Sequence, residues 1–213
     1  MNAETSTDLN SSSTFTPKDK RWSSWLLLAA IGLPMVMAYV VFSTGVGMPT
    51  GTVNKGDLLL PVTPLTDINI TLENGQPLAL LEGKKKWRWL IVGDNNCAKA
   101  CQENLYLSRQ VHIRLGDKAV RLERLYLNTD TAYSADFAQQ LRQQHPRLVM
   151  AHVNADEWQQ LLQQSNAADL ALDGTHLYVV DQQGFAMMTY NASHEGSDLL
   201  DDIKRLLKYS YED

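Results

Sequence analysis

Hydrophobic and polar positions divide the chain into one long apolar segment near the N-terminus and a longer region of mixed pattern. Residues 25–42 carry no charge, and about 18 apolar residues is close to the shortest helix that crosses the core of a bilayer. Three cations lie within residues 18–21, whereas the first cation after the apolar segment is Lys55. Because cytoplasmic flanks carry the excess of Lys and Arg, we predict a transmembrane anchor at residues 22–43 with its N-terminus in the cytoplasm.

The segments on either side of the anchor are polar or rich in glycine. Residues 1–21, rich in Ser, Thr and Asn, predict a disordered cytoplasmic tail, and residues 44–57 predict a linker. The alternative to an anchor is a cleaved signal peptide, whose apolar core is usually about 7–15 residues long. The segment here is longer and has no clear cleavage site, so an anchor is favoured. Residues 58–213 then form a domain in the periplasm of a bacterium, where a cysteine pair can persist as a disulfide.

Beyond the linker, short apolar runs alternate with helical patterns. Residues 87–93 are nearly all apolar and predict a central buried strand. Asn74-Gly75 predicts a tight turn between strands at 68–72 and 77–81. The remaining pattern predicts, in chain order, a helix at 98–115, a strand at 120–128, a helix at 134–145 capped by Ser134, a strand at 147–153, a helix at 156–164, strands at 175–181 and 185–190, and a C-terminal helix capped by Ser197. This alternation predicts an α/β sandwich with a mixed sheet flanked by helices.

Composition narrows the range of functions. The chain has 213 residues, of which 44% are hydrophobic, and a formal net charge of −5. This length fits one ordinary domain plus an attachment. The acidic balance, together with the lack of a basic face or a glycine loop for phosphate, argues against a nucleic-acid partner. No Ser-His-Asp or paired-carboxylate pattern indicates a hydrolase.

The only two cysteines, Cys97 and Cys101, come directly after the predicted buried strand. A spacing of four residues is about one helical turn, so both sulfurs face the same way. They can form a disulfide or bind one soft metal ion. The predicted helix N-terminus and Lys99 favour the thiolate, and Asn95 and Asn96 are candidates to cap that helix. Three interpretations stay open: a redox pair, a copper site, or a structural disulfide.

Residues 60–101, which run from LPVTP through the predicted hairpin and strand to CAKAC, resemble the Sco/SenC proteins. Those proteins are membrane-anchored, thioredoxin-fold copper chaperones for cytochrome c oxidase, and LYVVDQQGFAMMTY is similar to their late strand–turn–strand segment. The layout is closer still to small thioredoxin-like membrane proteins that accompany oxidase assembly factors in proteobacteria. The resemblance implies a thioredoxin-like sandwich behind one transmembrane helix. It also implies a place in the inner membrane, with respiratory oxidase subunits or assembly factors as partners.

The chain departs from the Sco/SenC pattern at the second cysteine and in the late loop. Those proteins have a proline after the second cysteine, where this chain has Gln102. The histidine of their copper site is replaced here by Asp173 and Gly174. His176 comes two or three residues later, in the predicted strand, where a shift of one residue turns a side chain to the other face. A copper site formed by the cysteine pair and His176 is therefore a hypothesis that the resemblance implies.

Two functions follow from these observations. The first, whose link to the oxidase the resemblance alone implies, is a factor in cytochrome c oxidase assembly that acts by copper handling or by thiol-disulfide exchange, the activity of a thiol-disulfide oxidoreductase. In exchange, Cys97 would be the more exposed attacking thiolate and Cys101 its resolving partner. The alternative is a non-catalytic docking or scaffold module with a structural disulfide. His112 is predicted to be structural, and His145 to mark a helix end.

Overall fold

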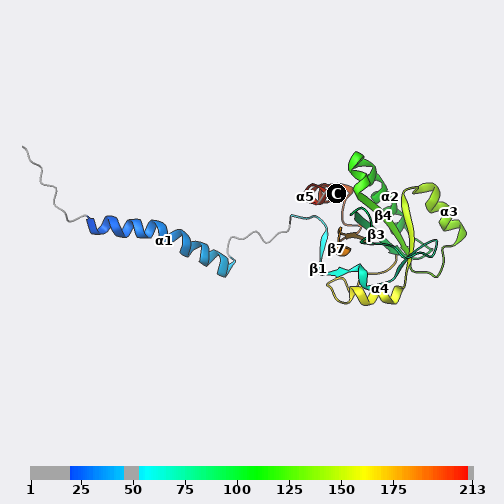
Figure 1. Cartoon of the computed structure of the whole chain (residues 1–213), viewed down its shortest axis with the longest axis horizontal. Coiled ribbons are helices and arrows are strands. Elements are labelled where there is room, and N and C mark those ends of the chain that lie inside the picture. The colour runs from blue at the N-terminus through cyan, green and yellow to red at the C-terminus, as the bar shows by residue number, and fades with distance from the viewer. Residues whose placement is uncertain (1–19, 46–52, 211–213) are drawn as a thin grey trace, which may run out of the picture. The chain divides into compact units, whose positions relative to one another are not determined.

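The computed structural model describes residues 20–45 and 53–210 of the chain. The chain forms two compact units, Met1–Thr52 and Val53–Asp213 (Figure 1). The first unit contains a single described helix, and the second contains a sheet covered by helices. The predicted tail lies outside the described residues except for its last two positions, as do residues 46–52 of the predicted linker.

Secondary structure alternates along the chain much as the hydrophobic pattern predicts. The elements are α1 (Lys20–Thr44), β1 (Asp57–Pro64), the 3-10 helix η1 (Leu65–Asp67), β2 (Ile70–Leu72), β3 (Trp87–Gly93), α2 (Lys99–Arg114), the 3-10 helix η2 (Gly116–Arg121), β4 (Leu122–Asn128), α3 (Ala135–Gln144), β5 (Leu148–Val153), α4 (Ala155–Leu162), β6 (Leu177–Val180), β7 (Phe185–Tyr190) and α5 (Gly196–Tyr209).

Helix α1 coincides with the predicted anchor. Its segment Trp25–Thr44 is long and apolar enough to cross a membrane by length and composition. Pro34 lies inside the helix, and such prolines are tolerated in membrane helices. The large apolar side chains described in this segment are exposed, so they do not pack into a protein core.

The second unit is built on one seven-stranded sheet in the order β1-β7-β6-β3-β4-β5-β2. Strands β3, β4 and β5 are parallel to one another, whereas β6, β7, β1 and β2 each pair with their neighbours in antiparallel fashion. Parallel neighbours need a crossover connection, which α2 supplies between β3 and β4 and α3 supplies between β4 and β5. The structure confirms the predicted mixed sheet flanked by helices.

Strand β3 occupies the centre of the sheet, and all seven of its residues are buried. Because successive side chains of a strand point to opposite faces, Trp89 and Ile91 enter one apolar core, while Leu90 and Val92 enter the other. The nearly continuous apolar run is thus explained by burial on both faces. Because β3 is buried on both faces, reactive side chains have to lie at or beyond the ends of the strand.

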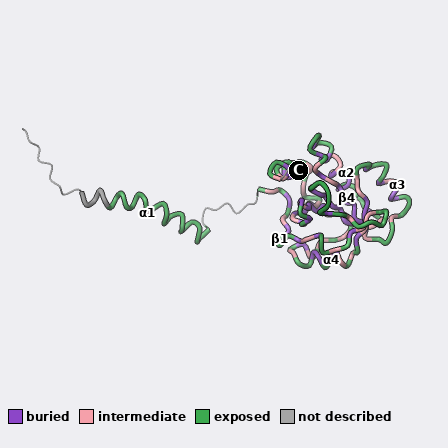
Figure 2. The backbone as a smooth tube through the Cα atoms, viewed as in Figure 1, coloured by how far each residue is buried: buried purple, intermediate pink, exposed green. Residues whose placement is uncertain are grey.

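Helices cover the two faces unequally. The core that contains Trp89 also receives the apolar residues of α2, α3 and α5, whereas the opposite core receives α4. Figure 1 shows α4 on one side of the sheet and α2 and α3 on the other. In Figure 2, buried residues follow the strands and the inner sides of these helices. The apolar stripe that the sequence places on the C-terminal helix, Leu199, Leu200, Ile203, Leu206 and Leu207, faces this core: Leu199, Ile203 and Leu207 are buried and the other two are half-buried.

The hydrophobic pattern does not predict strand β1, because its sequence DLLLPVTP does not alternate cleanly between apolar and polar residues. It pairs with β7 alone and therefore forms an edge of the sheet. An edge strand tolerates proline, because the missing N–H need not bond to a second neighbour. The predicted boundary between linker and domain, after residue 57, falls at the start of this strand.

The predicted hairpin around Asn74-Gly75 is only partly correct. The turn exists, with Gly75 at φ +80°, and β2 precedes it. The predicted second strand at 77–81 is wrong, since only one isolated bridge joins Thr71 to Pro77. Strand β2 pairs with β5. Two backbone hydrogen bonds still join β2 to the segment after the turn, from the Leu72 N–H to the Gln76 carbonyl and from the Leu78 N–H to the Ile70 carbonyl.

Two other boundaries differ from the pattern. The predicted strand at 120–128 begins only at Leu122, since the preceding residues form η2. Helix α5 is capped by Glu195 and Asp198 in a reciprocal capping box, and not by Ser197. The predicted Ser134 cap of α3 is confirmed, since its side chain accepts a hydrogen bond from the backbone N–H of Phe137.

The buried carboxylate of Asp202 in α5 forms hydrogen bonds with the first residues of the domain. Asp202 is 3% exposed, and its Oδ2 accepts hydrogen bonds from the backbone N–H groups of Lys55 at 2.7 Å and Gly56 at 3.1 Å. The Tyr190 hydroxyl donates to the same oxygen at 2.8 Å. One side chain thus satisfies three donors from two other segments.

We expect Asp202→Ala to lower the free energy of unfolding by about 3 kcal/mol, because three donors, two of them in buried hydrogen bonds, lose a carboxylate acceptor. Asp201→Ala removes an exposed carboxylate from the neighbouring position and should change it by no more than about 0.5 kcal/mol. Urea unfolding of the full chain in detergent, followed by tryptophan fluorescence, measures both. Equal unfolding midpoints for the two variants would refute the role of Asp202.

Candidate functional site

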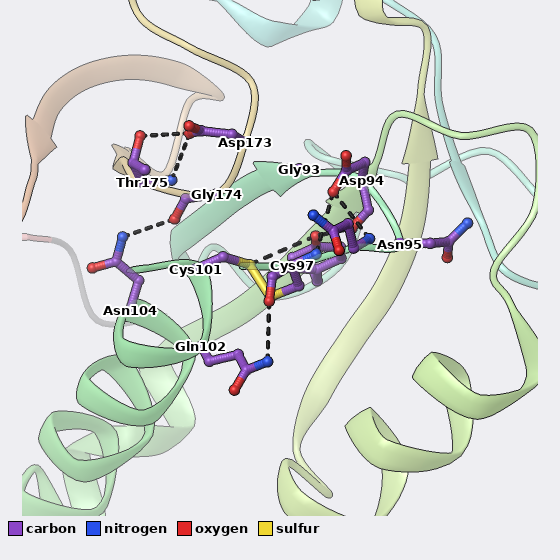
Figure 3. The surroundings of a disulfide bond; sticks show 12 residues. Gly93, Asp94, Asn95, Cys97, Cys101, Gln102, Asn104, Asp173, Gly174 and Thr175 are labelled. Atoms are coloured by element: carbon purple, nitrogen blue, oxygen red, sulfur yellow. Dashed lines mark hydrogen bonds between the residues drawn. A yellow bond between two sulfur atoms is a disulfide. The ribbon is translucent and has the colours of Figure 1, made fainter. Parts of the chain in front are cut away.

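The two cysteines form a disulfide at the end of the central strand (Figure 3). Their Cα atoms are 5.2 Å apart. Helix α2 begins at Lys99, so Cys101 lies in its first turn and Cys97 in the loop that connects β3 to it. The positions predicted for both residues relative to the strand and the helix are therefore confirmed.

The carboxylate of Asp94 shapes the loop that carries Cys97. Its Oδ1 accepts hydrogen bonds from the backbone N–H groups of Asn96 at 3.0 Å and Cys97 at 3.2 Å. Cys97 has a φ of 29°, a backbone conformation that residues other than glycine rarely adopt. Figure 3 shows Asp94 folded over this turn. Two amide hydrogen bonds thus hold a cysteine in an unfavourable conformation directly before the helix.

The predicted capping of α2 by Asn95 or Asn96 is wrong. The residue at the cap position is Ala98, which has no side-chain hydrogen bond to the helix. The side chain of Asn95 instead joins the loop to the start of α3, because its Oδ1 accepts from the backbone N–H of Ser134 at 2.9 Å. Sequence spacing did not reveal this contact, because the two residues are far apart along the chain.

Both cysteines are buried, Cys97 at 1% exposure and Cys101 at 0%. The predicted greater exposure of Cys97 is therefore absent from the disulfide form. A difference remains in their surroundings, since Cys97 lies between the exposed residues Asn96 and Ala98 in the loop. Cys101 is covered by a strand and by a second loop.

Gly174 covers Cys101 from the loop before β6. A Cβ atom at position 174 would lie 2.5 Å from the Cβ and Sγ atoms of Cys101, and the backbone of Gly174 has φ +80°. Both facts require glycine at this position. The carbonyl of Gly174 accepts a hydrogen bond from the Asn104 side chain at 2.8 Å, and its N–H donates to the Val92 carbonyl at 2.8 Å. Hydrogen bonds thus join this loop to both α2 and β3.

Tyr126 of β4 lies next to the disulfide. Its hydroxyl donates a hydrogen bond to the Asp94 carbonyl at 2.6 Å and lies 3.8 Å from the Cys101 Sγ. Burial, with smaller contributions from Tyr133 and nearby carboxylates, raises the pKa of Tyr126 well above its usual range. The phenol therefore stays protonated, and its one O–H, which donates to the Asp94 carbonyl in the disulfide form, could turn to a thiolate at position 101 instead. Sequence analysis did not identify Asp94, Asn104 or Tyr126 as site residues.

His176 is half-buried and lies one residue before β6. Its Nδ1 is 3.0 Å from the Thr175 hydroxyl. Burial lowers the pKa of His176, while the charges of Asp173 and Asp57 oppose this effect. Asp173 holds the loop through hydrogen bonds that it accepts from the backbone and hydroxyl of Thr175, at 3.0 and 2.6 Å.

The structure brings the two cysteines together but gives no evidence that His176 joins them. Among the described residues, no three His, Cys, Asp or Glu side chains form a group that could hold a metal ion. The chemistry of the donors still fits a soft ion, since two thiolates bind Cu(I). The copper site at the cysteine pair and His176 therefore stays a proposal.

The surroundings indicate what the reduced pair could do. The first turn of α2 places unpaired backbone N–H groups and a partial positive charge near Cys101, which favours a thiolate there. The predicted contribution of Lys99 is small, because its side chain is 91% exposed and lies 3.6 Å from Glu103. The site can therefore support thiolate chemistry if the loops allow access.

Comparison with known proteins places this geometry in context. A family described as "Transmembrane-like, thioredoxin-like, C-terminal domain" matches residues 87–210. No curated protein sequence matches the chain. Among solved structures, yeast Sco1 with copper bound aligns with a TM-score of 0.54 and 17% identity, covering 76% of this chain and 97% of that chain. Apo Sco1 from Thermus thermophilus aligns with a TM-score of 0.53 and 16% identity, covering 74% and 99%.

A third structure is that of BsSco, described as having a disulfide switch and as a member of the Sco family of cytochrome c oxidase assembly proteins. It aligns with a TM-score of 0.53 and 11% identity, covering 74% of this chain and 99% of that chain. Such low identities show a shared fold. They confirm the predicted thioredoxin-like fold and the resemblance to Sco proteins. Because the family match covers more than half of the sequence, the chain belongs to the family of transmembrane-like proteins with a thioredoxin-like C-terminal domain.

Proposed function

We propose that this protein is a membrane-anchored thioredoxin-like factor that acts by thiol-disulfide exchange at Cys97 and Cys101 in the assembly of cytochrome c oxidase. The observation that carries the proposal is the disulfide between the end of the central strand and the first turn of α2. In a fold shared with Sco proteins, this is the position where a helix N-terminus activates a thiol. The oxidase as the target rests on the resemblance to BsSco and its relatives.

The exchange moves two electrons and two protons. In the reduced protein, one cysteine thiolate attacks a partner's disulfide, forms a mixed disulfide and releases one partner sulfur as a thiolate. The second cysteine then attacks the mixed disulfide, which forms the Cys97–Cys101 bond and releases the other partner sulfur. The two protons lost by the cysteines are taken up by the partner's thiolates. The reverse sequence reduces this protein and oxidises a partner dithiol.

The roles of the two sulfurs follow from their surroundings. Cys97 belongs to a loop with exposed neighbours, so a small displacement of that loop would bring its sulfur to the surface. Cys101 is enclosed by Gly174 and Tyr126. Cys97 is therefore the attacking thiolate, and Cys101 resolves the mixed disulfide from within the protein.

We also propose, more specifically, that the reduced cysteine pair handles copper. Yeast Sco1 has been solved with copper bound, and two reduced cysteines one turn apart supply the soft ligands that Cu(I) prefers. Gly174 leaves no room for a side chain against Cys101, so a third ligand has to come from elsewhere. His176, two residues further along the same loop, is the proposed source.

The site of action is the periplasmic side of a bacterial inner membrane. Helix α1 supplies one candidate span, and the sequence places its cationic flank on the N-terminal side. An oxidising compartment is consistent with a disulfide as the resting form. The proposed partners are respiratory oxidase subunits or other assembly factors in that membrane.

A second candidate function is a docking or scaffold module in which the disulfide is structural. The burial of both cysteines, at 1% and 0% exposure, favours this alternative, because exchange requires access to a sulfur. The two functions differ in the reduction potential of the disulfide and in the reactivity of the free thiols.

If the pair exchanges, its reduction potential should lie above about −300 mV, whereas a structural disulfide should lie below that value. The potential is measured by equilibrating the full chain in detergent with thiol buffers of known potential and then alkylating the free thiols. A double Cys97→Ala, Cys101→Ala variant controls for background alkylation. A potential below about −300 mV would reject exchange and support the scaffold function.

The assignment of roles predicts unequal reactivity of the single cysteines. Cys101→Ser leaves Cys97 free, and this thiol should react with a small aromatic disulfide roughly ten times faster than Cys101 does in Cys97→Ser. Loop exposure on one side and enclosure by Gly174 on the other cause the difference. Stopped-flow absorbance measures both rates, and circular dichroism checks that both variants are folded. A faster Cys101 would reverse the assignment.

Copper handling predicts that the reduced full chain binds one Cu(I) in competition with a chromophoric chelator. Binding should be lost in Cys97→Ala and weakened in His176→Ala, while His152→Ala, which alters another half-buried histidine, should leave it unchanged. Loss in Cys97→Ala alone would exclude His176 as a ligand and leave a two-thiolate site. Failure of the unmodified protein to bind Cu(I) would reject copper handling altogether.

A further inference from the structure

A second polar site lies at the opposite end of α2 from the cysteines. A pocket of about 370 Å³ is bordered there by the last turns of α2, by η2 and by the turn that leads from α3 to β5. Its lining includes Arg109 and His112 from α2, Arg124 from β4 and Arg147 from the turn. No Asp or Glu belongs to the lining. Three arginines, of which Arg124 is buried, Arg109 is half-buried and Arg147 is exposed, therefore border one pocket whose lining has no carboxylate.

Arg124 is the most deeply buried of the three arginines, at 2% exposure. Its Nε donates to the Ser108 hydroxyl at 3.1 Å, and its Nη2 donates to the same hydroxyl at 3.0 Å and to the Leu105 carbonyl at 2.9 Å. Both acceptors are neutral. By contrast Arg88, which is 3% exposed, lies 3.3 Å from the carboxylate of Glu123. In the described part of the chain, Arg124 thus lacks the counter-charge that its buried neighbour has.

The other two arginines are also without a counter-charge. Neither Arg109 nor Arg147 forms an ion pair with any described residue of the domain. Burial, and then the charge of Arg109, lower the pKa of Arg124 to about 10. Burial, and then the charges of Arg124 and Arg109, lower the pKa of His145 to about 4. Arg109 and Arg124 therefore lie close enough for their charges to repel each other.

A buried positive charge is costly unless an anion compensates it. Guanidinium groups match phosphate oxygens through paired, charge-assisted hydrogen bonds. Three arginines around one pocket suit a dianion better than the single charge of a carboxylate. We propose that the pocket lined by Arg109, Arg124 and Arg147 binds a phosphate dianion, either as free phosphate or as the phosphomonoester headgroup of a lipid.

Helix ends offer a competing explanation for the arginines. The pocket borders the C-terminal ends of α2 and α3, and cations are favourable near the partial negative charge of such ends. That explanation covers side chains on or next to the helices, but it does not explain Arg124, which belongs to a strand. The two accounts differ in a measurable way, because only a binding site takes up phosphate.

The test is a calorimetric titration of the full chain, in a maltoside detergent at constant ionic strength, with inorganic phosphate. We expect saturable one-to-one binding that Arg109→Gln and Arg147→Gln each weaken roughly tenfold, because each removes a charged donor. Arg114→Gln removes an equal charge from an exposed position of α2 outside the pocket and should leave affinity unchanged. Thermal unfolding checks that the variants are folded.

Absence of saturable phosphate binding by the unmodified protein would overturn the proposal, as would equal weakening in all three variants. Short-chain phosphatidic acid then identifies the source of the phosphate. Affinity at least about tenfold higher than for inorganic phosphate, and sensitive to Arg147→Gln, supports a lipid headgroup. Affinity no higher than for inorganic phosphate supports the free anion. Equal binding of phosphatidylcholine would mean that acyl chains drive the contact, which would also overturn the proposal.

Discussion

Burial of β3 on both faces is the constraint on which the rest of this domain depends. Strands β4 and β6 pair with its two edges, and helices pack on its two faces, so its backbone and side chains are fully occupied. Polar and reactive side chains can therefore gather only beyond the end of the strand. The chain leaves the sheet after Gly93, and the loop and helix that follow carry both cysteines.

The site is then completed by segments that the sheet brings to the same end. Tyr126 comes from the strand parallel to β3, and Gly174 from the loop before the strand antiparallel to it. Their contacts with Cys101 are close, which protects this sulfur from solvent. The same packing accounts both for a buried disulfide and for the different surroundings of the two cysteines. This packing is therefore compatible with both the proposed exchange function and the scaffold alternative.

Helix α2 joins the two ends of the domain. The alternation of β4 directs both Arg124 and Tyr126 toward α2, because they are two residues apart. Tyr126 lies beside the first turn of the helix at Cys101, and Arg124 bonds to Leu105 and Ser108 further along it. One helix and one strand therefore support a sulfur site at one end and a cluster of arginines at the other. The two sites have separate chemistries and share only this support.

The sequence by itself determined the features that depend on neighbouring residues. The apolar run of α1, the buried strand β3, the cysteine spacing and the stripe of α5 each appear as a local pattern, because their periodicity reflects the environment of a single element. Local pattern failed at β1, where pairing with the distant strand β7 decides the structure, and at residues 77–81, where only one isolated bridge to β2 forms. Tertiary structure alone decided that Gly174 lies against Cys101, that Asp94 holds the Cys97 loop, and that three arginines share a pocket. Such contacts join residues as far apart as Asn104 and Gly174, which are 70 positions apart, and they exist only because the crossovers of the sheet bring those segments together.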